Sequence, residues 1–251
     1  MDDDKLSFTE HLVELRRRLI VCLIAIGTGF TICYNWSQEI FALLARPLQQ
    51  VLPPGSSLIF TTPTEAFLTY LKTAFIAGFF LVIPVVLYQV WRFIAPGLYK
   101  QEKTYVVPFV FCSWVLFVGG ALFGYFLVFP LAFKFFMGFS TDMIHAFPSM
   151  RDYFNFVIKL LVAFGVIFET PVFIFFLAKL GIVNYQMLRA FRKYFIVIAF
   201  IIGAILTPPD PISQTMMAIP LLILYEVSVL ITRFLGKKKL EEGEKAASVA
   251  D

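Results

Sequence analysis

The sequence has 251 residues, of which 59% are hydrophobic, 18% aromatic and 15% charged, and its mean hydropathy is +0.82. This composition excludes an ordinary soluble domain and indicates an integral membrane protein. The formal net charge of +4 would suit a nucleic-acid-binding surface, but the Lys and Arg residues flank apolar runs and form no patch interleaved with aromatic residues. We therefore expect no nucleic-acid partner.

The segment 7–19 precedes the first long apolar run and sets the orientation of that run. Ser7 and Glu10 have the spacing of a capping box, which predicts that a helix begins here. Three consecutive arginines (residues 16–18) stand directly before the apolar run, and basic residues beside a span stay in the cytoplasm. The aspartates at residues 2–4 replace the basic region of a signal peptide, and no small-residue cleavage site follows. We expect a retained first span with a cytoplasmic N-terminus.

Six apolar segments are predicted to cross the membrane as helices. Their approximate ranges are 19–36, 62–91, 104–129, 153–178, 194–206 and 211–233. The fifth offers about 20 Å of helix against a bilayer core of about 30 Å, so helices five and six are expected to be short. The fold class is thus an all-α membrane protein in which residues 1–235 form a single six-helix domain and residues 236–251 form a disordered cytoplasmic tail.

An amphipathic helix is predicted after the first span. Residues 37–51 are expected to lie along the outer interface, bent at Pro47. The apolar residues that repeat there at helical spacing are Ile40, Leu43, Leu44, Leu48 and Val51.

Local signals predict where other helices begin, end and meet. Thr62-Pro63-Thr64-Glu65 combines an N-cap, a proline and a capping-box glutamate at the start of span two. Gly120 and Gly124 have the spacing that lets another helix approach span three closely, and that span is expected to end at Pro130. The expected caps are Ser149 and Asp152 for span four and Asp210 for span six.

The distribution of basic residues predicts the topology. Most of the 21 Lys and Arg residues fall in segments assigned to the cytoplasmic side, and only Arg46, Lys134 and Arg151 fall in outer segments. This asymmetry and the even number of spans place both termini in the cytoplasm.

The sequence shows no motif of an enzyme. It lacks a nucleotide-binding loop, an H-E-x-x-H pair and a Cys/His metal cluster, so we expect neither catalysis nor a cofactor or metal. His11 and His145 lie in separate surface segments, where a solvated side chain is the simplest interpretation.

Two glutamates stand at span entrances on the predicted cytoplasmic face. Glu14 has Arg17 and Arg18 as helical neighbours, and taken alone a solvated ion pair is the default explanation. Glu102 has basic neighbours too. Together, two carboxylates on one face can receive two guanidinium groups through bidentate hydrogen bonds.

Polar groups within the later spans leave two interpretations open. Glu169 lies well inside span four, where an ionisable group is either functional or a protonated acid that hydrogen-bonds a neighbouring helix. Glu226 lies nearer the inner end of span six, and this position favours the second interpretation, a structural role. Gln214, one turn into span six, suits a polar contact between helices.

Four motifs in order resemble the TatC family, the six-span core subunits of the twin-arginine protein translocase. They are H-L-V-E-L-R-R-R-L, P-V-V-L-Y-Q-V-W-R-F-I-A-P-G-L-Y-K-Q-E-K, F-G-V-I-F-E-T-P and L-T-P-P-D-P-I-S-Q-T-M-M-A-I-P. The resemblance implies a protein of the bacterial cytoplasmic membrane that binds twin-arginine signal peptides of folded proteins at the cytoplasmic face. It also implies TatA and TatB single-span subunits and other copies of the chain as partners, with export driven by the proton-motive force.

The resemblance also implies roles for individual residues. Glu14 and Glu102 match the carboxylates that engage the paired arginines, and the same recognition segments contain Arg16, Phe93, Pro96, Leu98 and Tyr99. Pro47 matches a functional outer-loop proline and Glu169 a polar group in the concave face. Asp210 and Gln214 match the outer end where single-span partners dock.

Two other functions remain compatible with the residues. One is a proton-coupled secondary transporter that uses Glu169 and Glu226. The other is a membrane scaffold, in which replacing Glu14 and Glu102 would affect assembly alone.

Overall fold

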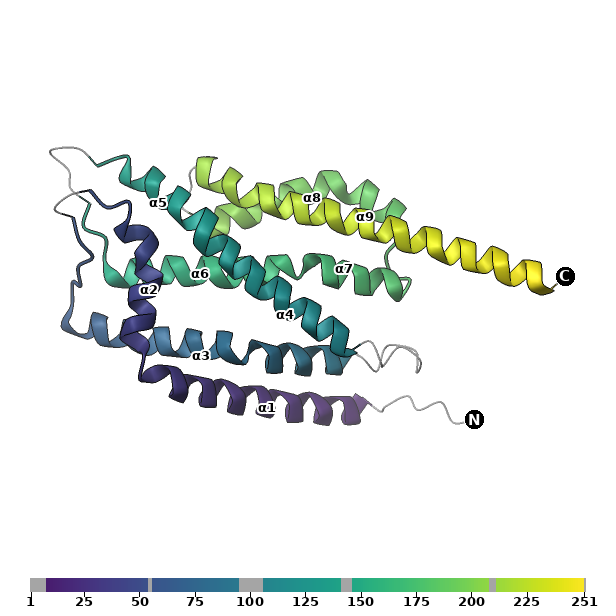
Figure 1. Cartoon of the computed structure of the whole chain (residues 1–251), viewed down its shortest axis with the longest axis horizontal. Helices are drawn as coiled ribbons and strands as arrows, with labels where there is room; N and C mark the ends of the chain where they lie inside the picture. Colours follow the sequence, from purple (N-terminus) through teal and green to yellow (C-terminus); the bar gives the residue numbers. More distant parts are fainter. Residues whose placement is uncertain (1–7, 54–55, 95–105, 141–145, 208–210, 251) are drawn as a thin grey trace. The chain divides into compact units, whose positions relative to one another are not determined.

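The computed structural model describes residues 8–53, 56–94, 106–140, 146–207 and 211–250, and most of these residues are helical. An isolated β-bridge joins Ile59 to Ser149. The helices, labelled in Figure 1, are α1 (Phe8–Tyr34), α2 (Ser37–Gln49), α3 (Pro63–Ile94), α4 (Val106–Phe123), a π-helix (Gly124–Val128), α5 (Phe129–Met137), α6 (Met150–Phe168), α7 (Thr170–Lys179), α8 (Tyr185–Leu206) and α9 (Pro211–Ala250).

Within the residues that the structure describes, five stretches of helix are long and apolar enough to cross a membrane. They are Glu10–Tyr34, Pro63–Ile94, Val107–Met137, Met150–Lys179 and Pro211–Phe234. Helix α8 has 22 residues, but its first turns carry Arg189, Arg192 and Lys193, so its apolar part is the short segment predicted from the sequence. The all-α membrane fold is thus confirmed, whereas the cytoplasmic location of both termini stays a prediction.

The chain divides into two compact units, each described here by itself. The first comprises Met1–Val115 and Phe136–Ile158, and the second Leu116–Phe135 and Lys159–Asp251. The single domain over residues 1–235 stays a prediction. Helix α9 continues to Ala250, through the tail expected to be disordered. Lys, Glu and Ala, which dominate the sequence of this tail, are good helix formers, so its composition is compatible with a helical backbone.

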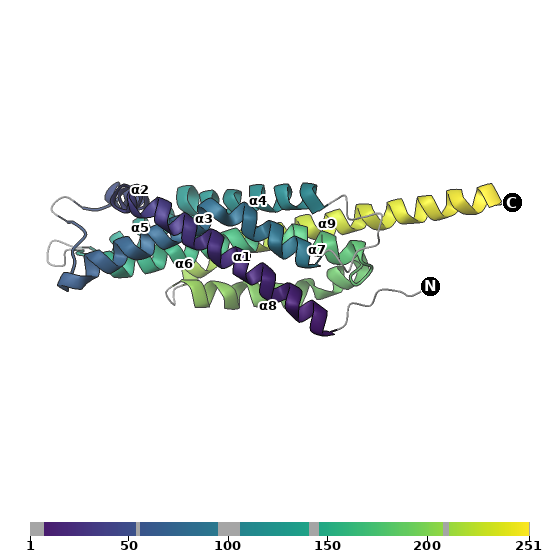
Figure 2. The same ribbon diagram turned by 90° about the horizontal axis from the view of Figure 1, so that it is seen from below.

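In the first unit α1 lies along α3, and α2 crosses them (Figures 1 and 2). A glycine from each long helix stands at the contact: a Cβ added at Gly29 would lie 2.5 Å from the carbonyl oxygen of Gly78. Such backbone proximity is typical of helices that pack in a membrane. It sets the distance between α1 and α3 at this contact.

Helix α2 forms over most of the predicted range 37–51 and contains Pro47. Of the apolar residues predicted to lie at the outer interface, Leu48 is buried within the protein and Leu43 is exposed. The other buried residues are Ser37, Phe41, Ala45 and Pro47. This buried face therefore consists largely of small and aromatic side chains. One of them, Phe41, packs edge-on against Tyr70 of α3.

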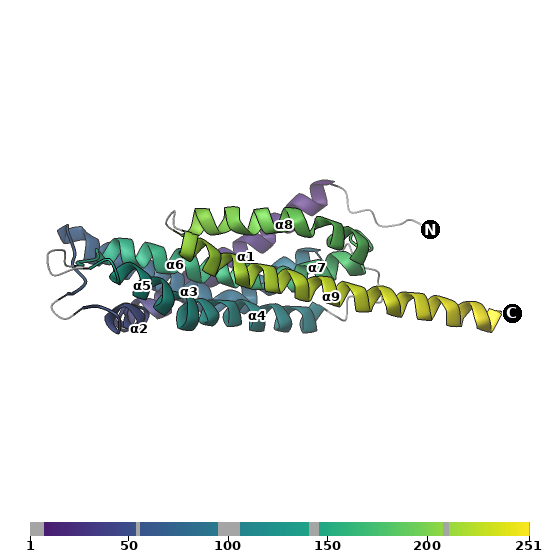
Figure 3. The ribbon, with the colours of Figure 1, turned by 90° about the horizontal axis from the view of Figure 1, so that it is seen from above.

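In the second unit α8 lies beside α9 (Figure 3). Tyr225 of α9 stacks on Phe195 of α8 with ring centroids 4.0 Å apart, and its hydroxyl donates to the carbonyl oxygen of Leu188 at 2.7 Å. On α4, a side chain at Gly120 would meet the backbone of Phe164, and Gly124 faces the ring of the same residue. The close approach predicted from the spacing of these two glycines is confirmed.

The expectation that the third span ends at Pro130 is wrong. The π-helix Gly124–Val128 comes first, and α5 then continues through Pro130 to Met137. A π-helical turn directly before a proline changes the local hydrogen-bonding pattern, so the helix need not end at the proline. Sequence patterns cannot distinguish such a restart from a helix end.

Replacing Gly29 with Ala is expected to lower the free energy of unfolding by about 2 kcal/mol, because the added methyl group overlaps the Gly78 carbonyl and forces α1 away from α3. Unfolding of the detergent-solubilised protein by SDS measures this. Gly27→Ala is the matched control, because an added Cβ there meets nothing within 4 Å. Equal stability of the two variants would contradict the proposed role of the glycine contact.

Candidate functional site

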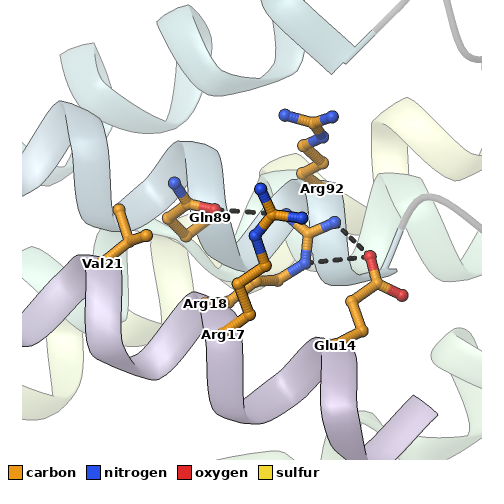
Figure 4. Close-up of a pocket in the computed structure, with 6 residues that line it drawn as sticks. All are labelled: Glu14, Arg17, Arg18, Val21, Gln89 and Arg92. Carbon is orange, nitrogen blue, oxygen red and sulfur yellow. Dashed lines mark hydrogen bonds and ion pairs between the residues drawn. The ribbon is translucent and has the colours of Figure 1, made fainter. Parts of the chain in front are cut away.

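A pocket of about 260 Å³ lies between the N-terminal half of α1 and the C-terminal part of α3, in the first unit (Figure 4). Its lining contains one carboxylate, three guanidinium groups and an amide: the residues are Glu14, Arg17, Arg18, Val21, Gln89 and Arg92. The pocket therefore contains Glu14, one of the predicted site residues. The pairing of α1 with α3 brings the other lining residues next to it.

The carboxylate of Glu14 already binds a guanidinium group. Arg18 donates to Oε1 of Glu14 through both Nε, at 3.1 Å, and Nη2, and its Nη1 donates to Oε1 of Gln89 at 3.2 Å. The side chains of Arg18 and Glu14 are only 13% and 27% exposed. Of the two neighbours predicted to pair with Glu14, Arg18 forms the ion pair and Arg17 points into the same pocket.

Phe93 lies near the pocket on α3 and contacts α1. Its ring stacks on that of His11, with centroids 4.4 Å apart. His11, expected to be solvated and not a ligand, is half-buried in this stack. Arg16 is exposed on α1. Four predicted recognition residues, Glu102, Pro96, Leu98 and Tyr99, lie outside the described residues, and so does His145.

The predicted intramembrane and partner-contact residues are placed on separate elements. Glu169 is half-buried at the break between α6 and α7, where its carbonyl accepts the amide of Phe173 at 2.9 Å. Gln214 of α9 donates to the carbonyl of Phe200 on α8 at 2.8 Å, so the expected polar contact between helices is confirmed. Pro47 is buried in α2. Asp210 lies outside the described residues.

Glu226 forms an ion pair on the surface of the second unit. Its Oε2 accepts from Nη2 of Arg192 at 2.6 Å, and both side chains are more than 40% exposed. An exposed pair of this kind contributes little to stability and offers no enclosed proton path. The structural role favoured for Glu226 from the sequence fits this geometry.

The sequence analysis missed the long-range role of Glu65. This buried carboxylate accepts four hydrogen bonds at the end of α3 remote from the pocket. Thr61 donates its amide and its hydroxyl to Oε2, each at 2.8 Å, while Oε1 accepts the hydroxyl of Ser149 at 2.6 Å and the amide of Arg151 at 2.9 Å. Glu65 thus joins the first turn of α3 to the start of α6.

Gln89 and Arg92 are the other residues that the sequence analysis did not select. They are three positions apart near the end of α3, so they share a helix face. This spacing of two polar residues within an otherwise apolar span is the signal that identifies them.

Comparisons with known proteins agree on one family. The model of the family described as Sec-independent protein translocase protein (TatC) matches residues 10–220. The TatC protein of Desulforapulum autotrophicum is 47% identical over 100% of this chain and 93% of its own length, and that of Escherichia coli K12 is 42% identical over 96% and 93%. A crystal structure described as the twin arginine translocase receptor TatC has a TM-score of 0.80 at 45% identity, covering 90% of this chain and 99% of its own.

Replacing Glu65 with Gln is expected to destabilise the protein by about 2 kcal/mol, because an amide cannot accept all four hydrogen bonds and leaves buried donors unsatisfied. SDS-induced unfolding measures the change. Glu39→Gln on α2 removes one carboxylate from an exposed position and is expected to have little effect. A loss of the same size in both variants would refute the joining role of Glu65.

Proposed function

The chain belongs to the TatC family of Sec-independent protein translocase proteins, and from this membership we propose that it is the receptor for twin-arginine signal peptides. It acts in a bacterial cytoplasmic membrane with both termini in the cytoplasm. TatA and TatB subunits and further copies of the chain join it, and the proton-motive force drives export. The chain performs no catalysis in this function.

The observation that carries the proposal is the occupied state of Glu14. This carboxylate binds the forked guanidinium of Arg18 in a partly enclosed pocket, so its position and orientation suit an arginine ligand. A signal-peptide arginine would take the same place after displacing Arg18. Gln89 offers the displaced guanidinium an amide oxygen on α3.

The second arginine of the signal peptide requires a second acceptor, and we propose Glu102. In the sequence, this residue comes shortly after the end of α3 that lines the pocket. Phe93 then offers an aromatic surface, already stacked on His11, beside the first site. Arg16, Pro96, Leu98 and Tyr99 complete the proposed recognition surface.

Partner contacts are proposed at sites away from the pocket. Gln214 lies in the first turn of α9, and Asp210 precedes that helix in the sequence. Single-span subunits are proposed to dock at these two residues, and Pro47 is proposed to shape α2 for the outer interface. Glu169 supplies a polar group at the α6 to α7 break. The exposed pair of Glu226 with Arg192 argues against the transporter alternative, which needs Glu226 in an enclosed path.

Binding of an Arg-Arg signal peptide and of its Lys-Lys counterpart to the purified chain in nanodiscs tests the proposal. Changing Glu14 and Glu102 together to Gln is expected to remove the preference for Arg-Arg and to weaken its binding by about 2 kcal/mol or more, since charge-assisted bonds are lost.

Glu10→Gln, which removes a negative charge from an exposed position one turn earlier on α1, is the matched control and is expected to retain the preference. If neither peptide binds, or if the double variant binds like the unchanged chain, Glu14 is only an ion-pair partner of Arg18 and the receptor function is refuted.

Lengthening the apolar part of α8 by four residues is expected to reduce transport without reducing signal-peptide binding. A short span thins the bilayer locally, and one more turn, about 5.4 Å, relieves this. Transport by the assembled translocase in membrane vesicles is measured beside peptide binding. A variant with four leucines substituted in α8 at unchanged length is the control, and normal transport by the lengthened chain would contradict the thinning hypothesis.

A further inference from the structure

The pocket between α1 and α3 carries more positive than negative charge. Arg17, Arg18 and Arg92 line it with a single described carboxylate, that of Glu14. Because Arg18 is paired with Glu14, two guanidinium groups are left in excess. Even with Glu102 as a second carboxylate, the arginines would outnumber the acids.

Arg17 and Arg92 have no acidic partner among the residues that the structure describes. Nη1 of Arg92 donates to the hydroxyl of Tyr88 at 3.3 Å, and its guanidinium lies 5.8 Å from the centre of that ring. These contacts orient Arg92 without neutralising it. Arg17 lies on α1, one turn before Val21, and lines the pocket from the side opposite to α3, which carries Arg92 (Figure 4).

Arg17 and Arg92 line the same pocket from two helices, so both positive charges lie at one space, and an anion bound there would offset both. Phosphate is suited to it, because several oxygens of one group can accept hydrogen bonds from two arginines at once. Gln89 uses its oxygen to accept from Arg18, which leaves its NH₂ group as a further donor at the pocket wall.

The pocket also has an apolar lining residue, Val21 of α1. Ile20 and Ile24, near it on the same helix, have 45% and 64% of their surfaces exposed. Basic pockets between transmembrane helices at the cytoplasmic side bind phospholipid head groups. An acyl chain beside such isoleucines would extend along the helix while its phosphate stays with the arginines.

We propose that Arg17 and Arg92 hold a phosphate group in this pocket, supplied by the head group of an anionic phospholipid. This ligand goes beyond the signal peptide, and the proposal depends on the receptor function only for the side of the membrane to which the pocket belongs. The bound phosphate neutralises the excess charge, so a cationic signal peptide approaches Glu14 without repulsion from Arg17 and Arg92.

Native mass spectrometry of the detergent-solubilised chain, titrated with phosphatidylglycerol or phosphatidylcholine, tests the proposal. The first phosphatidylglycerol is expected to bind about tenfold more tightly than phosphatidylcholine, the size of one charge-assisted pair. Arg17→Gln with Arg92→Gln is expected to bring the two lipids to within about twofold of each other. The corresponding Lys variants keep the charge but lose the fork, and are expected to be intermediate.

Arg189→Gln with Arg233→Gln is the matched control, because it removes two exposed arginines from α8 and α9 and leaves the pocket intact. It is expected to keep the tenfold preference. The proposal is overturned if the pocket double variant keeps the full preference, or if the control loses as much of it.

A competition experiment identifies the source of the phosphate. Inorganic phosphate is added to the chain loaded with phosphatidylglycerol, with chloride at equal ionic strength as reference. Displacement by phosphate alone means that free phosphate also fits the site, and no displacement means that the ligand is the lipid. Equal displacement by both salts indicates unspecific charge attraction and overturns the proposal.

Glu14→Gln separates this proposal from the receptor function. It is expected to abolish the preference for Arg-Arg peptides yet to keep the lipid preference, since removing a negative charge leaves the pocket more cationic. Loss of the lipid preference in this variant would show that Arg17 and Arg92 do not hold the phosphate by themselves.

Discussion

The close approach of α1 and α3 at Gly29 and Gly78 is the constraint on which the described site depends. Two apolar helices gain little from burying apolar surface against each other in lipid, so their association requires close packing and polar contacts. The glycines allow the backbones to meet, and this brings Arg18 within hydrogen-bonding distance of Gln89. Larger residues at the contact would separate the helices and divide the pocket between two surfaces. The small side chains in the middle of the span thus determine the chemistry at its end.

Much of the fold could be predicted from the sequence because apolar length and flanking charge report directly on spans. The start of α3 and the glycine contact of Gly120 also followed from local patterns. The end of the third span did not, because a π-helical turn stands directly before Pro130 and the helix continues beyond it to Met137. The contact of Phe41 on α2 with Tyr70 of α3 was not predicted either. Both features depend on a neighbouring segment, and the periodicity of one segment carries no information about its neighbours.

The candidate site shows the same limit at the level of single residues. Glu14 was identifiable from its charge, its position before a span and the family motif, but its helical neighbours Arg17 and Arg18 were equivalent by spacing. In the structure, Gln89 accepts a hydrogen bond from Arg18, which favours Arg18 as the partner of Glu14. This hydrogen bond depends on the pairing of α1 with α3. Glu65 was predicted as a local cap, and its bonds to the start of α6 are invisible without the fold. Sequence reasoning therefore finds the charged groups, while the partners come from tertiary structure.

The occupied state of Glu14 suggests why a receptor of this kind would require two arginines. A single incoming arginine that displaces Arg18 exchanges one guanidinium for another, so the number of ion pairs at Glu14 is unchanged and the net gain is small. A second arginine that pairs with another carboxylate, for which Glu102 is proposed, adds an interaction that the empty receptor lacks. Lysine does poorly in this exchange, because its ammonium cannot reproduce the fork that Arg18 already provides through Nε and Nη2. Internal competition by Arg18 would thus convert a modest preference for arginine into a requirement for the pair.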